Sequence, residues 1–292
     1  MKIQQIRETV TNQVIASLEE GNPPWTKPWN NDGSSTPLAL MPRNGKTKRP
    51  YSGINWLILN LFNPFDTDEW FTKNQAIELT KLDKPIPYEE MKNGTNIIFY
   101  KDMFKENDKG ETEKYPLMRS YTVWNRDQIP TLPPSKIEKT DFNAQTEIEK
   151  MLNNLGLKGG VHVGGNQAFY MPSRDAICIP NDDAFENEFQ REATKAHEGC
   201  HATGAKHRLN RKCRLERSKE NYAYEELIAE LGAAMVCGSI GMPLEKLQHQ
   251  SYIETWLERL KSDTKYIFKA SAEAAKAAQY LMGETNANTA NQ

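Results

Sequence analysis

Two histidines four residues apart constrain this chain more than any other feature. His197 and His201 enclose Glu198 in an HExxH pattern, within the segment TKAHEGCHATGAKHRLNR (194–211). On a helix, residues four apart project from one face, so the two imidazole rings can bind one metal ion. A glutamate between them lies near enough to take a proton from a metal-bound water. Two chance histidines on a surface helix are the alternative, but three of the five histidines fall within residues 197–207.

A hydrolytic metal site needs three protein ligands and one open position, and the sequence offers two candidates for the third ligand. The segment HEGCHATGAKH fits the metzincin pattern HExxHxxGxxH, in which Gly204 turns the chain and His207 returns to the metal. His207 also begins a basic stretch that is typical of a surface loop.

The second candidate lies in the segment YAYEELIAELGAAM (222–235), where Glu226 and Glu230 are four apart on a predicted helix. Like charges at this spacing repel, and the surrounding alanines indicate close helix packing in place of an open acidic face. We therefore expect Glu226 to bind the metal and Glu230 to accept a hydrogen bond from a metal-bound imidazole. A solvent-facing acidic stripe is the alternative. The pattern favours Glu226 over His207, and His207 stays open.

Composition indicates a soluble globular protein and excludes several classes. Of the 292 residues, 38% are hydrophobic, the net charge is −2, and no apolar run approaches the ~18–20 residues of a membrane span. The first twenty residues have apolar side chains at helical spacing with charges between them, which predicts an amphipathic helix and no secretory signal. The four cysteines are scattered without a CxxC pair, which is typical of reduced thiols. We expect a cytoplasmic protein with no membrane partner.

The distribution of residue types predicts two domains. Five of the six tryptophans precede residue 130, whereas all five histidines follow residue 160. Between them lies IPTLPPSKIEKTDFN (129–143), a proline-rich and polar segment that reads as a linker. We predict a first domain over 1–135, a second over 136–283 and a disordered polar tail over 284–292.

Hydrophobic periodicity predicts an α+β fold, with a mixed first domain and a mainly helical second domain that contains a small sheet. NGTNIIFYKDMFK (93–105) and PLMRSYTVWNRDQI (116–129) flank a charged, glycine-containing segment, which is a hairpin pattern. Two strands are expected in HVGGNQAFYM (162–171) and RDAICIP (174–180). Helices are expected at 51–62, 72–82, 143–155, 186–203, 220–238, 249–261 and 264–282.

The first domain carries basic and aromatic residues side by side in PPWTKPW (23–29) and MPRNGKTKRPYSGINW (41–56). Cations track a phosphate backbone, and aromatic rings stack on unpaired bases, so this combination predicts single-stranded DNA binding. The alternative is that the tryptophans are core residues and the basic run is a solvated loop. The candidate DNA-binding residues are Trp25, Trp29, Arg43, Lys46, Lys48, Arg49, Tyr51 and Trp56.

Motifs from both halves, in this order, resemble those of the ArdC-type antirestriction proteins of conjugative plasmids and phages. The similarity runs from about residue 5 to residue 283. The motifs are PPWTKPW, NGKTKRPYSGIN, WFTKNQA, NGTNIIFYK, RSYTVWNRDQI, AFYMPSRDAICIPNDDAF, ATKAHEGCHATG, RLNR and YAYEELIAELGAA.

The resemblance implies an N-terminal domain that binds single-stranded DNA and a C-terminal zinc-metallopeptidase-like domain related to the SprT/Spartan proteases. It implies that incoming plasmid DNA is protected from restriction, with His197, His201 and Glu198 at the positions of the family's histidines and catalytic glutamate. EELIAE matches the family's downstream acidic motif, which supports Glu226. The chain departs from the pattern at Ala205, where the family has histidine, and at His207, where it does not.

Three hypotheses follow from this pattern. In the first, an antirestriction protein binds single-stranded DNA and has an active metallopeptidase centre, with Zn²⁺ or another divalent ion such as Mn²⁺ as cofactor and Glu198 as general base. Its protein target would be a host restriction enzyme or a DNA-bound protein. In the second, the metal site of such a protein is structural. In the third, an ordinary zinc metallopeptidase acts on DNA-bound or other proteins with no direct role in DNA protection, and its N-terminal domain recognises protein instead of DNA.

Overall fold

The computed structural model of this protein describes residues 3–25, 41–61, 65, 67–80, 86–106, 112–133, 143–214, 218–242 and 250–284. Trp29 and residues 285–292 of the predicted tail lie outside these ranges. The helices are α1 (Ile3–Glu19), α2 (Gly53–Leu61), α3 (Lys73–Thr80), α4 (Ala144–Asn154), α5 (Glu188–Thr203), α6 (Lys219–Ser239), α7 (Gln250–Ser262) and α8 (Tyr266–Leu281). The strands are β1 (Arg43–Asn44), β2 (Glu69–Thr72), β3 (Thr95–Glu106), β4 (Thr112–Asn125), β5 (Gly160–Val163), β6 (Phe169–Met171) and β7 (Ala176–Ile179).

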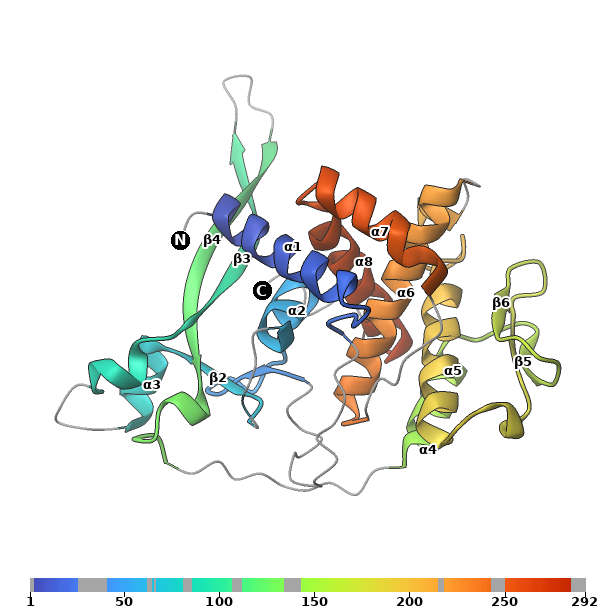
Figure 1. The fold of residues 1–292 in the computed structure, drawn as a ribbon, viewed down its shortest axis with the longest axis horizontal. Coiled ribbons are helices and arrows are strands. Elements are labelled where there is room, and N and C mark those ends of the chain that lie inside the picture. The colour runs from blue at the N-terminus through green and yellow to red at the C-terminus, as the bar shows by residue number, and fades with distance from the viewer. Residues whose placement is uncertain are drawn as a thin grey trace.

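The first sheet has the strand order β1-β2-β4-β3, in which β1 and β2 are parallel and the other pairs are antiparallel. Its longest part is the β3–β4 hairpin, paired from Thr95 opposite Val123 to Glu106 opposite Thr112. The hairpin confirms the prediction made from the two β-rich runs. In Figure 1 it rises out of the body of the molecule as a two-stranded ribbon.

The second sheet is small, with the order β5-β7-β6, and it lies beside α5 (Figure 1). The segment 162–171 was predicted as one strand, and this prediction is wrong. Gly164 and Gly165 have φ angles of 141° and 81°, which L side chains rarely adopt, so the chain turns there and splits the segment between β5 and β6. The mixed first sheet and the helical region with a small sheet confirm the α+β class.

The main hydrophobic core is built from both halves of the chain. Val14 and Leu18 of α1, Trp25, and Trp56 and Leu57 of α2 join one buried cluster with residues of α4, α5, α6, α7 and α8. In particular, α2 packs against α8 and α1 packs against α7 (Figure 1). The domain boundary near residue 135 stays a prediction, and the first two helices depend on the second half for their burial.

Helices α5 and α6 lie close together because small residues line their contact. A Cβ atom added at Gly232 would lie 2.8 Å from the Cys200 sulfur. On another side of α5, a Cβ atom added at Gly199 would lie 3.0 Å from Leu152 of α4 and from Leu281 of α8. The alanines of α6 are buried along the same helix. This close approach brings the HExxH helix and the acidic helix together. None of the helices in the described ranges combines the length and the apolar character that crossing a bilayer requires.

Candidate metal centre

The predicted metal ligands converge from two neighbouring helices. His197 and His201 lie in the C-terminal half of α5, which begins where the Asn187 side chain accepts a hydrogen bond from the Gln190 amide. Glu226 lies in the second turn of α6, which Ser218 caps in the same way. Both histidines are buried, and the Glu226 side chain is mostly buried.

The distances between these side chains suit a divalent ion. His197 Nε2 lies 3.4 Å from Glu226 Oε2, and His201 Nε2 lies 3.4 Å from Glu226 Oε1. Ligands about 2.1 Å from a tetrahedral ion are about 3.4 Å from one another, and two imidazoles with one carboxylate form a common catalytic zinc set. Within the described ranges, these three residues are the group whose ligand atoms all lie within 4.8 Å.

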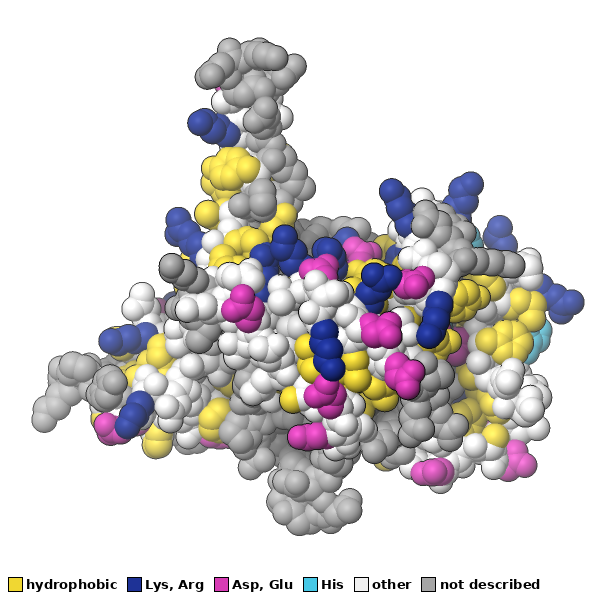
Figure 2. Space-filling model, turned by 45° about the horizontal axis from the view of Figure 1, so that its top comes forward, with side chains coloured by type: hydrophobic (Ala, Val, Ile, Leu, Met, Phe, Trp, Pro, Cys, Tyr) yellow, Lys and Arg dark blue, Asp and Glu magenta, His cyan; other side chains and the backbone are white. Residues whose placement is uncertain are grey.

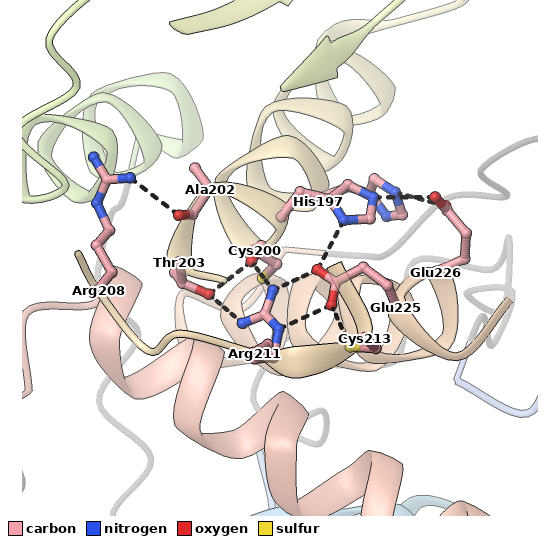
Figure 3. Close-up of polar contacts among 10 residues, drawn as sticks. His197, Cys200, Ala202, Thr203, Arg208, Arg211, Cys213, Glu225 and Glu226 are labelled. Atoms are coloured by element: carbon pink, nitrogen blue, oxygen red, sulfur yellow. Dashed lines mark hydrogen bonds and ion pairs between the residues drawn. The ribbon is translucent and has the colours of Figure 1, made fainter. Parts of the chain in front are cut away.

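A second carboxylate, Glu225, holds the His201 ring in place and is itself bound by Arg211 (Figure 3). His201 Nδ1 lies 3.2 Å from Glu225 Oε1, and Arg211 binds both oxygens of the same carboxylate, at 2.6 and 3.0 Å. Arg211 is also anchored to Thr203 and to the Cys200 carbonyl oxygen. Since an ionised Glu225 can only accept, the His201 proton lies on Nδ1, and the Nε2 lone pair is left for a metal.

The role that was predicted for Glu230 is therefore wrong. His201 Nδ1 is paired with Glu225, and Glu230 accepts a hydrogen bond from the Trp25 indole at 3.3 Å. Burial raises the pKa of Glu230 to about 8, since the Trp25 hydrogen bond offsets only part of that effect. Glu225, one residue before Glu226, does what Glu230 was expected to do.

The electrostatics of the site favour a bound cation. Burial alone would lower the pKa of His201, but the charge of Glu226, together with the Glu225 carboxylate, raises it to about 10. Burial lowers the pKa of His197, so that ring is neutral, as a ligand must be. The Glu225 and Glu226 carboxylates thus stabilise a positive charge on His201. A bound metal ion would supply positive charge at the same place.

Two further groups lie within electrostatic reach of the site. Glu198 is buried on α5, and its charge contributes to the raised pKa values of His201 and Cys200. Burial and then the charge of Glu226 raise the pKa of the Tyr252 phenol on α7. The general-base candidate and one phenol thus accompany the three ligand candidates.

His207, the other candidate ligand, contacts a different carboxylate. Its Nε2 lies 3.4 Å from Asp175 Oδ2, and half of its side chain is exposed. Asp175 also binds Arg208 through both oxygens and accepts a hydrogen bond from Tyr170. The segment after α5 is thus tied to the end of the small sheet, and Arg208 and Arg211 are buried anchors within it.

The structure does not bring together all the residues predicted to bind DNA. Trp25 and Trp56 are only 5% and 3% exposed and belong to the main core, so their rings cannot stack on bases. This corrects their assignment in favour of the core alternative. Tyr51 is partly buried beside the Trp70 cluster, with its hydroxyl 3.4 Å from the Asn44 amide.

The basic loop between β1 and α2 is exposed, but its cations have acidic partners. Arg43 pairs with Asp68 at 2.5 Å, Lys46 pairs with Glu78 at 2.5 Å, and Lys48 pairs with Glu69. A nucleic acid would have to compete with these carboxylates. Arg49 is exposed on the same loop.

Sequence reasoning did not give Glu225 or Arg211 the roles that they have in the structure, although both stand in motifs that it singled out. Glu225 differs from Glu226 only by one helical position, and Arg211 was read as part of a surface loop. The sequence did contain one indication of these roles. A glutamate on a helix that is predicted to be buried needs a cation beside it, and Arg211 is near enough in the chain to provide one.

Two closely packed helices that present a His₂Glu set, with a glutamate between the histidines, define a zincin-like metallopeptidase fold. A zincin-like metallopeptidase family model matches residues 146–273, and a model for the N-terminal domain of anti-restriction factor ArdC matches residues 4–124. The chain belongs to the ArdC antirestriction protein family.

Solved structures and sequence relatives agree with this. Two crystal structures of antirestriction protein ArdC from plasmid R388, one metal-free and one Mn(II)-bound, match with TM-scores of 0.75 and identities of 33% and 31%. The matches cover 95% and 99% of this chain and 97% and 100% of theirs. Uncharacterized protein y4eC of Sinorhizobium fredii (strain NBRC 101917 / NGR234) is 31% identical over 94% of this chain and 91% of its own length.

Two DNA primases TraC of Escherichia coli are 31% and 30% identical over 94% of this chain, which spans only 20% and 27% of their length. These findings confirm the resemblance. The zincin-like match and the Mn(II)-bound relative support a divalent metal such as Zn²⁺ or Mn²⁺ as the cofactor.

Proposed function

We propose that this protein protects incoming plasmid or phage DNA from restriction by binding single-stranded DNA, and that it carries a metal-dependent peptidase centre. The observation that carries the proposal is the meeting of His197, His201 and Glu226 between α5 and α6, with Glu225 behind His201. Family membership supplies the antirestriction context.

In this proposal Nε2 of His197, Nε2 of His201 and a carboxylate oxygen of Glu226 would hold the metal. A bound divalent ion would polarise a scissile carbonyl and acidify a water molecule. Glu198 accepts the proton of the attacking water on its carboxylate and delivers it to the leaving amine nitrogen. Glu225 and Arg211 keep the His201 ring oriented during these steps.

Either zinc or manganese is compatible with this donor set. Imidazole nitrogens suit zinc, and carboxylate oxygens suit manganese as well. The R388 relative is described with Mn(II) bound. The candidate protein substrate is a host restriction enzyme or another protein on the bound DNA, and the cytoplasm is the proposed location, since the cysteines are free thiols.

For DNA contact, the exposed loop that carries Lys46, Lys48 and Arg49 supplies cations next to Arg43 and Tyr51. Because three of the four cations are paired with carboxylates, we assign the loop a supporting role in phosphate contact. Binding should fall steeply as salt is raised.

The variant Glu198→Gln tests whether hydrolysis is part of the function. Since Glu198 is not a proposed ligand, the variant should retain the metal and the melting temperature of the wild type. Its proteolysis of a DNA-bound restriction enzyme should fall by about 10²–10⁴-fold. Glu188→Gln, an exposed change in the first turn of the same helix, is the matched control.

Protection of single-stranded plasmid DNA from cleavage is measured alongside. If wild-type protein gives no protection with metal bound, the antirestriction role is wrong. If Glu198→Gln protects as well as wild type, hydrolysis does not cause protection. Protection by both proteins would also exclude the third hypothesis, in which the protein is a peptidase with no role in protection.

A further inference from the structure

The β3–β4 ribbon has two faces, and the register assigns each residue to one of them. Residues directly opposite each other in an antiparallel pair point to the same side of the ribbon. Ile97 is opposite Tyr121, Phe99 is opposite Arg119, and Met103 is opposite Tyr115. These positions and Lys105 alternate with the remaining residues, so all of them lie on one side.

The outer part of this side is aromatic and basic, and it is open to solvent. Tyr121 and Tyr115 are 42% and 43% exposed, and Arg119 and Lys105 are exposed as well. Phe99 packs edge-on against Tyr121, with ring centroids 5.9 Å apart and an interplanar angle of 89°. Figure 2 shows that the ribbon projects from the body and carries hydrophobic and basic side chains.

The other side is anchored to the body near its base. Ile98 is buried on this side with Val10 of α1 and Ile58 of α2, and the Arg7 guanidinium of α1 lies 3.5 Å from the Met118 sulfur. The Asn55 side chain of α2 also bonds the amide and the carbonyl of Ile98 along the outer edge of β3. Farther out, Tyr100 and Phe104 are 50% and 65% exposed on this side. On the Tyr121 side, Ile97 and Val123 are buried at the base with Leu59 of α2 and Trp70, and the part beyond them is accessible.

Exposed aromatic rings cost hydrophobic free energy, and a contiguous group of them marks a binding surface. Rings alternating with cations suit a single-stranded nucleic acid, whose bases stack on the rings while its phosphates meet the cations. A duplex hides its base faces from such rings. Tyr115 and Tyr121 are six residues apart, roughly 20 Å along a strand at ~3.3 Å per residue, which leaves room for several nucleotides.

We propose that this surface, the aromatic face (Phe99, Met103, Lys105, Tyr115, Arg119 and Tyr121), is the main binding site for single-stranded DNA. The inference rests on the proposed function and deepens it. It places the site on the ribbon instead of the loop at 43–49, where Lys46 and Lys48 are paired with Glu78 and Glu69.

The first test compares two tyrosines of similar exposure on opposite sides of the same ribbon. Binding of the full-length protein to a fluorescein-labelled thirty-base oligothymidylate is followed by fluorescence anisotropy. Tyr121→Ala should weaken binding about tenfold, because one stacked base is lost. Tyr100→Ala should change the affinity by less than about twofold, and Tyr121→Phe, which keeps the ring, should bind as wild type does.

The second test addresses the cation. Arg119→Ala should reduce the slope of log affinity against log salt concentration by about 0.7, the value for one phosphate contact on a single strand. Arg119→Lys should keep the wild-type slope. An Arg119→Ala slope equal to that of the wild type would overturn the placement of phosphate on this face. Melting temperatures of all variants confirm that each is folded.

The outcomes separate this inference from the proposed function. If wild-type protein binds no single-stranded DNA, the DNA-binding part of the proposed function fails and the inference fails with it. If wild type binds but Tyr121→Ala and Tyr100→Ala behave alike, the inference alone is wrong. Tighter binding of an RNA oligonucleotide of matching length and sequence would overturn the assignment to DNA.

Discussion

The metal centre and the aromatic face differ in how far their functional side chains are exposed to solvent. At the metal centre the candidate ligands are buried between α5 and α6, and His201 is held by Glu225, which Arg211 holds in turn. On the ribbon Tyr115 and Tyr121 are partly exposed to solvent on a two-stranded element, which packs against the body at its base. Metal binding needs ligands set in advance, whereas a flexible single strand needs surface that stays accessible.

From this contrast we expect substitutions in the HExxH region and on the ribbon to have different effects. Around the metal centre the side chains are linked by hydrogen bonds, so a substitution of one of them also changes the contacts of its neighbours. On the ribbon, substitutions such as Tyr121→Ala should alter binding and leave stability nearly unchanged, because the side chain is already exposed.

The largest effect is expected for removal of the third ligand. Glu226→Gln should lower the affinity for Zn²⁺ by about 10³-fold or more, because the site loses a charged ligand of three. His207→Ala should leave the affinity unchanged, since His207 contacts Asp175. Competition with a chromophoric chelator measures both. A loss of affinity in His207→Ala alone would restore the metzincin arrangement.

A large loss of stability is expected when the buried ion pair behind the metal helix is broken. Asp175→Asn leaves Arg208 without its bidentate partner and should destabilise the fold by about 3–5 kcal/mol at pH 7. Denaturant unfolding measures this, with the exposed Asp183→Asn as control. Equal stabilities of the two variants would show that Arg208 finds another partner.

The same pair predicts a pH dependence. Although burial opposes it, hydrogen bonds from Arg208 and Tyr170 hold the pKa of Asp175 well below its usual range. A group with a lowered folded pKa contributes stability above its unfolded pKa, near 4, and loses it as the pH falls further. The difference between wild type and Asp175→Asn should therefore shrink below about pH 4.

An intermediate effect is expected at the carboxylate behind His201. Glu225→Gln keeps the shape of the side chain but removes the charge that orients the ring, and groups of this kind typically change metal affinity by about 10–100-fold. Glu254→Gln, at an exposed position of α7, is the control. If the affinity of Glu225→Gln for Zn²⁺ equals that of wild type, Glu225 neutralises Arg211 and does not contribute to metal binding.

The smallest effect is expected at the contact between the two helices. Gly232→Ala places a methyl group 2.8 Å from the Cys200 sulfur and should cost about 1 kcal/mol of unfolding free energy. Adding Cys200→Ala to Gly232→Ala removes the clashing atom, so the double variant should recover part of the loss relative to Cys200→Ala alone. Additive effects in this cycle would mean that the helices simply move apart.

The sequence could predict which residues share a face of one helix, but it could not predict contacts that depend on how two elements pack. The HExxH spacing fixes His197 and His201 on one helical face, and this needs no tertiary information. Which glutamate of α6 supports His201 depends on how the helix is rotated against α5, so Glu225 and Glu230 could not be told apart. Trp25 and Trp56 were misassigned because an aromatic ring serves a core and a stacking surface equally well in sequence.

The most direct test is anomalous scattering from crystals of the full-length protein grown with Zn²⁺. The account predicts one peak at the zinc edge, about 2.0–2.2 Å from Nε2 of His197, Nε2 of His201 and a carboxylate oxygen of Glu226. A peak bound by His207 in place of Glu226, or no peak between α5 and α6, would contradict it.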